Sequence, residues 1–188
     1  GIKILLSDKG IATIEFPHLL NLIEKNQFDT IYHEHFSYFS LFTVLNIFSS
    51  HDLEIFDVEE IPTHGGSLRL YIKHKKNNIF SITDNVKIVL DKEKEAKLDD
   101  INTYKLFSNK VYLSKQKLNN FFKLCKKSNK KIIGYGAPAK GNTLLNFCKI
   151  DSIMLPFTVD KSLQKQGLYL PGTHIPIKSP EEIKKSKP

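Results

Sequence analysis

The fold of this chain is decided most clearly by residues 131–148, which read KIIGYGAPAKGNTLLNFC. An apolar run, Lys131–Tyr135, precedes a glycine-rich turn and a short helical pattern. A second apolar run, Leu155–Val159, follows and ends at Asp160. Two strands joined through a helix form a βαβ unit with parallel strands and a right-handed crossover. The pattern therefore predicts an α/β fold, with His174–Ile177 as a third strand.

The residues before this stretch divide into two further parts. Residues 1–76 alternate between short helices and strands, and Leu53–Ile61 and Ser67–His74 have the alternation of an antiparallel hairpin. Residues 77–130 are predicted to form a linker of two amphipathic helices. The expected organisation is thus three parts, of which residues 131–188 form the last.

The composition excludes several classes of protein. The net charge is +8, and lysine supplies nearly all of the positive charge because Arg69 is the only arginine. Nucleic-acid grooves usually use arginine as well as lysine, so we expect no nucleic-acid partner. No apolar run approaches the roughly 18 residues of a membrane span, so we expect no membrane contact. A basic surface does suit a small anionic substrate such as a nucleotide diphosphate.

The two cysteines, Cys125 and Cys148, lie far apart in the sequence. They form neither a zinc-binding pattern nor a disulfide framework. The first residues lack the long apolar stretch and cleavage site of a signal peptide. We therefore expect two buried thiols in a reducing, cytoplasmic environment.

The densest polar cluster is Tyr32-His33-Glu34-His35, which is surrounded by aromatic residues. Two imidazoles, a carboxylate and a phenol are groups that serve proton abstraction next to a carbonyl. In an extended or turning segment His33 and His35 share one side, so all four residues reach one site only if the segment is irregular. His-x-His is also a metal-ligand spacing, but no third ligand stands out, and we expect no metal. Hydrogen-bonded residues at a helix entry remain the structural alternative.

The glycine-rich turn follows a strand and opens a helix, where backbone N–H groups can approach a phosphate. Its spacing differs from the dinucleotide fingerprint, and Asn142 stands where a P-loop has its lysine. A diphosphate held by backbone amides and Lys140 is one interpretation, and a tight packing turn is the other. Asp160 is placed where a Rossmann acid meets a ribose hydroxyl. The candidate binding residues here are Gly134, Gly136, Lys140, Asn142 and Asp160.

Two further loops carry candidate ligand contacts. Gly65 and Gly66 precede Arg69, whose guanidinium could bind an anion through two hydrogen bonds. A simple hairpin loop is the alternative at that position. The segment Lys165–His174 contains two glycines and a proline near the predicted carboxyl ends of the strands, where α/β sheets bind ligands.

Taken together, these segments resemble the C-methyltransferases that methylate NDP-4-keto-6-deoxy sugars on carbon. The resemblance rests on Ile14–His18, Phe28–Ser40, His64–Arg69, Gly134–Asn142 and Lys165–His174, in the order of the family. It implies a zinc-binding region, a central S-adenosylmethionine domain and a Rossmann-like C-terminal domain for the nucleotide-sugar substrate. Residues 1–76 then correspond to the end of a class I methyltransferase sheet, whose last strands form an antiparallel pair.

The resemblance also implies that this chain is truncated at both ends. Neither the zinc cysteines nor the glycine-rich methyl-donor loop occurs in it. The first strand, Ile11–Phe16, also lacks the parallel partners that its helix–strand–helix context implies. We therefore expect the full-length parent to use S-adenosylmethionine, and this chain alone to be inactive.

Carried over from the family, the catalytic base falls on His35, with Tyr32 and Glu34 at supporting positions. The implied reaction removes the proton next to the sugar keto group, and the resulting enolate carbon accepts the methyl group. A non-catalytic nucleotide-sugar-binding module is an alternative function. A fragment of an NAD-dependent sugar-nucleotide oxidoreductase is another, but the glycine spacing argues against it.

Overall fold

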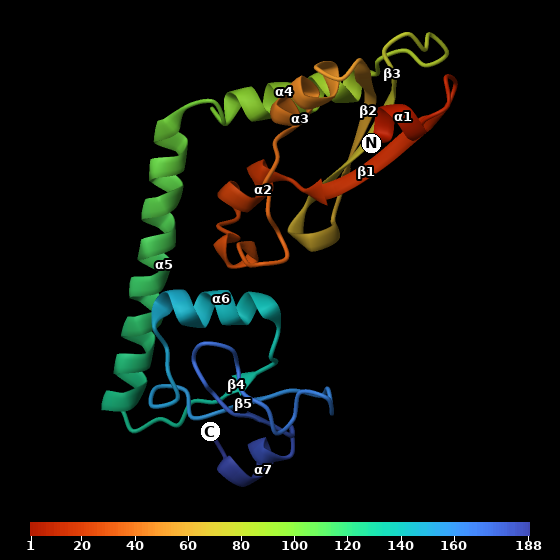
Figure 1. Ribbon diagram of the computed structural model, residues 1–188. Coiled ribbons are helices and arrows are strands. Elements are labelled where there is room, and N and C mark those ends of the chain that lie inside the picture. The colour runs from red at the N-terminus through yellow and green to blue at the C-terminus, as the bar shows by residue number, and fades with distance from the viewer. The chain divides into compact units, whose positions relative to one another are not determined.

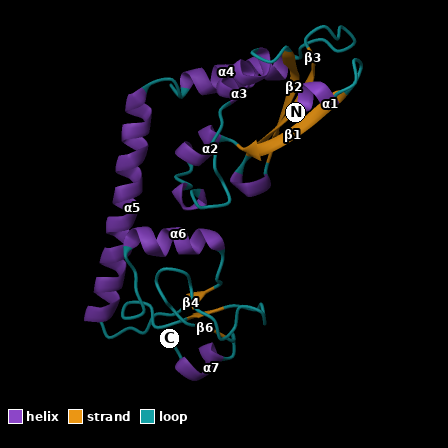
Figure 2. Ribbon diagram, viewed as in Figure 1, coloured by secondary structure: helices purple, strands orange, loops and turns teal.

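The computed structural model describes all residues from Gly1 to Pro188 and contains two compact units. Unit 1 comprises Gly1–Gln27 and Ser37–Ser108, and unit 2 comprises Phe28–Phe36 and Asn109–Pro188. Each unit combines helices with a small sheet, as the colours of Figure 2 show. The α/β class predicted from the sequence is confirmed at this level.

Unit 1 is built on a three-stranded sheet in the order β1-β3-β2 (Figure 1). Its strands are β1 (Ile11–Pro17), β2 (Leu53–Ile61) and β3 (Ser67–His74). Both outer strands pair antiparallel with β3, which confirms the predicted hairpin of β2 and β3. β1 has no parallel partner in this chain, as the sequence analysis noted, and it pairs with the antiparallel β3.

The core of unit 1 follows from the alternation of β3. Leu68, Leu70 and Ile72 are fully buried, whereas Arg69 and Tyr71 between them point to the more exposed face. Two helices contribute to this core, α3 (Leu41–Ser49) and α4 (Asp84–Glu95). The hydroxyl oxygen of Ser40 accepts a hydrogen bond from the Thr43 amide and caps α3. The remaining elements of unit 1 are α1 (Ile2–Leu5), α2 (Leu19–Glu24) and the 3₁₀ turn η2 (Thr63–Gly65).

Unit 2 contains a parallel sheet of very short strands in the order β4-β5-β6. The strands are β4 (Gly134–Tyr135), β5 (Thr158–Val159) and β6 (Ile177–Lys178). The helix α6 (Ala139–Cys148) connects β4 to β5, so the predicted parallel βαβ unit is confirmed. The long helix α5 (Ile101–Lys127) begins in unit 1 and continues into unit 2. The other elements of unit 2 are the 3₁₀ turn η1 (Phe28–Thr30) and α7 (Glu182–Ser186).

The strands of unit 2 are shorter than their apolar runs predicted, and prolines limit β5 and β6. The amides of Thr158 and Asp160 donate to β6, so Pro156, which lies on the same side of β5 and has no N–H, cannot extend the β5–β6 ladder. His174, the predicted start of the third strand, has a left-handed φ of 54°, and Pro176 follows it. The apolar residues of these runs still enter the core, which includes Ile132, Leu155 and Ile175.

The two cysteines differ in burial. Cys148 is buried in the core of unit 2, and burial raises the pKa of its thiol. Cys125 is only half-buried, so the expectation of two buried thiols is wrong for that residue. Its position near the end of α5 leaves part of the side chain at the surface. None of the helices is both long and apolar enough to cross a membrane.

Candidate functional site

The segment Tyr32–His35 forms a turn that follows η1. The amide of His35 donates to the carbonyl oxygen of Tyr32 at 3.0 Å, which folds the segment back on itself. The preceding η1 packs on α6, and the rings of Phe28 and Phe147 lie 5.3 Å apart. The turn is therefore held to unit 2 through an aromatic contact.

The turn brings the predicted catalytic side chains together around Tyr32. The edge-on rings of Tyr32 and His35 lie 4.9 Å apart, and the ring of His33 lies 5.9 Å from Tyr32. The Tyr32 phenol is hydrogen-bonded to the Glu34 carboxylate. The segment thus has the irregular geometry that allows Tyr32, Glu34 and His35 to meet. His33 and Glu34 are exposed, whereas Tyr32 and His35 are half-buried.

The surroundings of Tyr32 favour its protonated form. Burial raises the pKa of the phenol, and the charge of Glu34 and their hydrogen bond raise it further. At neutral pH the Tyr32 phenol is consequently protonated, and it donates its one hydrogen to the Glu34 carboxylate beside the His35 imidazole. A phenol that can exchange this partner for a carbonyl oxygen, next to a potential base, can serve removal of a proton adjacent to that carbonyl. No group of three or more His, Cys, Asp or Glu side chains is arranged to hold a metal ion.

The glycine-rich turn lies at the carboxyl end of β4 and enters α6. Gly136 has φ of 96°, a backbone conformation that favours glycine. Gly134 approaches β5 so closely that a Cβ atom would lie 2.7 Å from the hydroxyl of Thr158. Pro138, the N-cap of α6, provides no side-chain cap, so the first amides of this helix have no capping side chain. Half-buried Lys140 and Asn142 lie in its first turn.

Asp160 stabilises this loop directly. Its carboxylate accepts hydrogen bonds from the amides of Ala137 and Ser162 at 2.7 and 2.8 Å. These bonds hold the pKa of Asp160 below its usual value, and nearby Lys165 lowers it further. The Lys165 ammonium also donates to the Ala137 carbonyl at 3.0 Å. The carboxylate therefore already has partners within the loop, and a ribose contact by Asp160 stays a prediction.

Lys165 is a loop residue that the sequence analysis did not assign. It belongs to the segment Lys165–His174, which was noted only for its glycines and its proline. The lysine itself carried no signal, because the chain contains many lysines and the loop does not show which side chain returns to the glycine-rich turn.

The other candidate turn is filled by its own neighbours. A Cβ on Gly65 would lie 2.3 Å from Gln27, and one on Gly66 would lie 2.6 Å from Asn21. Both glycines also have positive φ, at 90° and 125°. They are therefore required by local packing, as in the hairpin-loop alternative. This turn is filled by side chains and is not an open glycine cradle.

Arg69 lies at the centre of a cross-strand ion cluster in unit 1. Its guanidinium contacts Glu15 on β1 and Glu59 on β2, each at 3.3 Å. The strand register explains this, because both carboxylates lie directly opposite Arg69. The pKa of Arg69 is raised by hydrogen bonds to Glu15 and Tyr71. Two carboxylates thus already pair with the guanidinium that was predicted to bind an anion. Substrate binding by Gly65, Gly66 and Arg69 stays a prediction.

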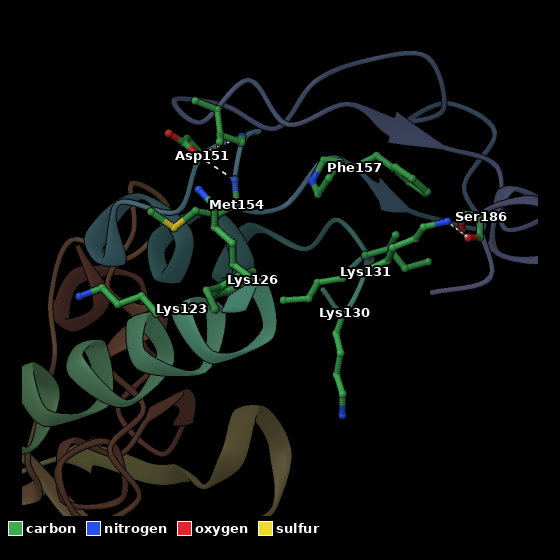
Figure 3. A pocket seen from close by; sticks show the side chains of 13 residues that line it. Lys123, Lys126, Lys130, Lys131, Asp151, Met154, Phe157 and Ser186 are labelled. Carbon is green, nitrogen blue, oxygen red and sulfur yellow. Dashed lines mark hydrogen bonds between the residues drawn. The ribbon is translucent and has the colours of Figure 1, made fainter. Parts of the chain in front are cut away.

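A separate cavity of about 470 Å³ lies at the amino ends of the unit 2 strands (Figure 3). Its walls are apolar and include Phe157, and four lysines surround it: Lys123, Lys126, Lys130 and Lys131. Figure 3 shows Lys131 turned toward Ser186, whose carbonyl oxygen accepts its hydrogen bond at 3.3 Å. Gly136 and Asp160 follow the carboxyl ends of the same strands, so this cavity is distinct from the predicted diphosphate site.

Comparison with known proteins identifies the family. The family model of the C-methyltransferase C-terminal domain matches residues 62–188. The chain belongs to this family. It is also 35% identical over 182 residues to the C-methyltransferase NovU of Streptomyces niveus, which is 97% of this chain and 43% of that protein. This chain thus spans less than half of the length of the relative that it matches.

Proposed function

We propose that this chain is part of an S-adenosylmethionine-dependent C-methyltransferase that acts on an NDP-4-keto-6-deoxyhexose. The observation that carries the proposal is the meeting of Tyr32, Glu34 and His35 in one turn. Membership of the C-methyltransferase C-terminal domain family supports methyl transfer to carbon as the reaction of the parent. A cytoplasmic location is part of the same proposal.

The chemistry assigned to this chain is formation of the enolate. The keto group acidifies the proton on the neighbouring carbon, and the His35 imidazole accepts that proton. The C–H electron pair moves toward the keto oxygen, to which the protonated Tyr32 phenol can donate its one hydrogen once that hydrogen leaves Glu34. In the free protein the Glu34 carboxylate accepts this hydrogen and so holds the phenol in place. S-adenosylmethionine would supply the methyl group in the parent, and no residue of this chain is assigned to its binding.

The substrate diphosphate is proposed to bind at the glycine-rich turn. The uncapped amides of α6 and the charge of Lys140 attract an anion there. Residues 131–188 would then be a Rossmann-like nucleotide-sugar domain, supported by the parallel order of β4, β5 and β6. Residues 1–76 would be the end of a class I methyltransferase sheet, supported by the antiparallel pair β2–β3, and residues 77–130 would link the two.

Replacement of His35 in the full-length parent tests the reaction. We expect His35→Ala to slow solvent exchange of the proton next to the keto group by about 10²–10⁴-fold, the usual contribution of a general base. The measurement is deuterium incorporation into the nucleotide sugar without methyl donor, with substrate affinity measured in parallel. His33→Ala is the matched control and should exchange nearly as the wild type. Normal exchange in the His35 variant together with loss in the His33 variant would show that the wrong histidine was assigned.

A non-catalytic nucleotide-sugar-binding module is the second candidate. It is favoured by one observation, namely that the family model covers residues 62–188 and leaves out the Tyr32–His35 turn. The same experiment separates the two functions. A wild-type parent that binds the nucleotide sugar but neither exchanges its proton nor transfers methyl would establish the binding module.

A further inference from the structure

The ring of Phe147, on the last turn of α6, is shared by three neighbouring side chains of unit 2. The ring of Phe28 in η1 lies edge-on at 5.3 Å, and the ring of Tyr112 on α5 lies at 5.7 Å. The ammonium of Lys115, about one turn further along α5, lies 4.8 Å from the centroid of the Phe147 ring. Edge-on aromatic pairs and a cation over an aromatic face are each favourable beyond the burial of their surface. Phe147 therefore holds η1 to α5 and α6 through one ring.

Backbone hydrogen bonds connect η1 to the turn that follows it. The Ile31 amide donates to the Phe28 carbonyl oxygen at 3.0 Å, and the Tyr32 amide donates to the Thr30 carbonyl oxygen at 3.1 Å. The His35 amide then donates to Tyr32. Phe28 and Thr30 are only 8% and 5% exposed, whereas none of residues 31–36 is buried. The buried η1 therefore sets the position of the backbone that carries Tyr32 and His35.

The carboxyl end of α6 is itself fixed to α5. The side-chain amide of Asn119 on α5 donates to the carbonyl oxygens of Lys115 and Cys148, each at 3.0 Å. Cys148 directly follows Phe147, and both Cys148 and Ile150 are almost completely buried. A close-packed interior does not let such a helix end shift freely. The Phe147 ring is therefore a fixed support for η1.

The same helix begins at the glycine-rich turn, where the substrate diphosphate is proposed to bind. With 10 residues at 1.5 Å per residue, α6 is about 15 Å long. One helix thus connects the proposed diphosphate site, at its amino end, with the support of the Tyr32–His35 turn, at its carboxyl end. A bound diphosphate limits where the attached sugar can lie. The place of His35 relative to α6 then decides whether the imidazole reaches the sugar proton.

We propose that Phe147 is a positioning residue that holds the Tyr32–His35 turn at a fixed place relative to the amino end of α6. The inference rests on the proposed function, because His35 is taken as the base and the start of α6 as the diphosphate site. Phe147 acts through η1 and is assigned no contact with the substrate. A base must lie within hydrogen-bond reach of its proton, about 2.6–3.2 Å between heavy atoms, and a displacement of about 1 Å can slow a reaction roughly 10²-fold.

The first test measures the order of the turn by backbone nitrogen relaxation NMR, on this chain as wild type and as Phe147→Leu. Leucine keeps an apolar side chain but has no ring for Phe28 to contact. We expect the order parameters of the Tyr32 and His35 amides to fall from about 0.85, typical of a rigid backbone, to below about 0.6. The amides of α6 should keep their wild-type values. Phe121→Leu, which removes a ring of α5 that is 51% exposed, is the matched control and should leave the turn unchanged.

Unchanged order parameters of the turn in Phe147→Leu would overturn the proposal, as would a turn that is equally mobile in the wild type. Phe147→Tyr keeps the ring and should restore the wild-type order parameters, and a tyrosine variant as mobile as the leucine variant would contradict the proposal. Phe28→Leu removes the same ring pair from the side of η1. It should loosen the turn to the same extent, and it takes the place of Phe147→Leu if that variant does not fold.

The second test uses the full-length parent with saturating nucleotide sugar. Phe147→Leu should slow exchange of the proton next to the keto group about tenfold, because the base is displaced. The Kd of the nucleotide sugar should stay at its wild-type value, because the amino end of α6 is unaltered. A merely structural role would not separate the rate from the affinity in this way. Phe147→Tyr should restore the rate, and Phe121→Leu should leave it unchanged.

An unchanged exchange rate in Phe147→Leu would overturn the positioning role. A weaker Kd with an unchanged rate would overturn it as well, because the effect would then lie at the diphosphate site. If the wild-type parent itself exchanges no proton, the proposed function fails, and the relaxation result alone decides whether Phe147 fixes the turn.

Discussion

The two sheets of this protein differ in how much of the fold they carry. In unit 1 the strands are 7 to 9 residues long, and one strand alone buries three aliphatic side chains completely. In unit 2 each strand has only two residues, and the buried side chains come mainly from helices and loops. A long ladder specifies its own register, whereas a short one depends on the contacts around it. Unit 2 should consequently be more sensitive to changes in its loops.

The largest effect that tests this comparison is expected from a cavity created in the core of unit 1 or of unit 2. Leu70→Ala in β3 and Ile175→Ala before β6 each remove a fully buried side chain. Each should lower the free energy of unfolding of its own unit by about 2–5 kcal/mol. Denaturant-dependent amide exchange of β3 and of β6 measures the two units separately. Ile153→Ala, at a side chain that is 81% exposed, is the control. Equal loss of protection in both units from either substitution would show that they unfold together.

The second prediction concerns a pair of loop glycines in unit 2. Gly167 and Gly172 both have positive φ, at 82° and 79°. A Cβ on Gly167 meets nothing within 4 Å, but one on Gly172 would lie 2.2 Å from Asn146. Gly167→Ala should therefore lower the free energy of unfolding by about 1–2 kcal/mol, from backbone strain alone. Gly172→Ala should have the same strain and lower the free energy of unfolding by a further ~1–3 kcal/mol from overpacking. Chemical denaturation measures both. Equal costs would mean that the loop moves away from α6 without loss.

A smaller, pH-dependent effect is expected at Asp160. Its pKa is lowered in the folded protein, so its contribution to stability is complete above the ordinary value near 3.8 and is lost as the pH falls through the lowered pKa. Asp160→Asn removes this dependence. The unfolding midpoint of unit 2 should therefore fall less between pH 6 and about pH 3 in the variant than in the wild type. An identical fall in both would show that other carboxylates control acid unfolding.

The smallest effect is expected at Arg69, on the exposed face of the larger sheet. Its two ion pairs join three neighbouring strands but remain accessible to solvent. Arg69→Gln should lower the free energy of unfolding by at most about 1 kcal/mol, and salt should reduce the difference. In the full-length parent the same variant also tests the predicted anion contact. A loss of nucleotide-sugar affinity much larger than the loss of stability would support that contact.

The sequence predicted the long elements well because their signals are local. Alternation along Leu53–Ile61 and Ser67–His74 gave the bounds of both strands. The strands of unit 2 were predicted too long, because an apolar run shows burial but not where hydrogen bonding to the neighbouring strand ends. Pro156 became informative only when the hydrogen bonds from β5 to β6 were known.

The candidate site likewise has features that the sequence predicted and features that only the structure showed. The residue types and spacing of Tyr32–His35 indicate groups suited to proton transfer, so the sequence alone was enough to select these residues as candidates. Their turn, and the bond between Tyr32 and Glu34, were decided by tertiary packing of η1 on α6. Phe147 had no distinguishing signal, since one phenylalanine in a short helical pattern looks like an ordinary core residue.

What the sequence determined by itself was therefore the class of fold, the long strands and helices, and the chemical groups available to the site. These follow from periodicity and residue type, which act over a few neighbouring positions. Only the tertiary structure decided that Asp160 secures the glycine-rich turn, that Arg69 is shared by two strands, and that Phe147 packs on Phe28. Each of these contacts joins residues at least 10 positions apart, and only the folded chain brings such residues into contact.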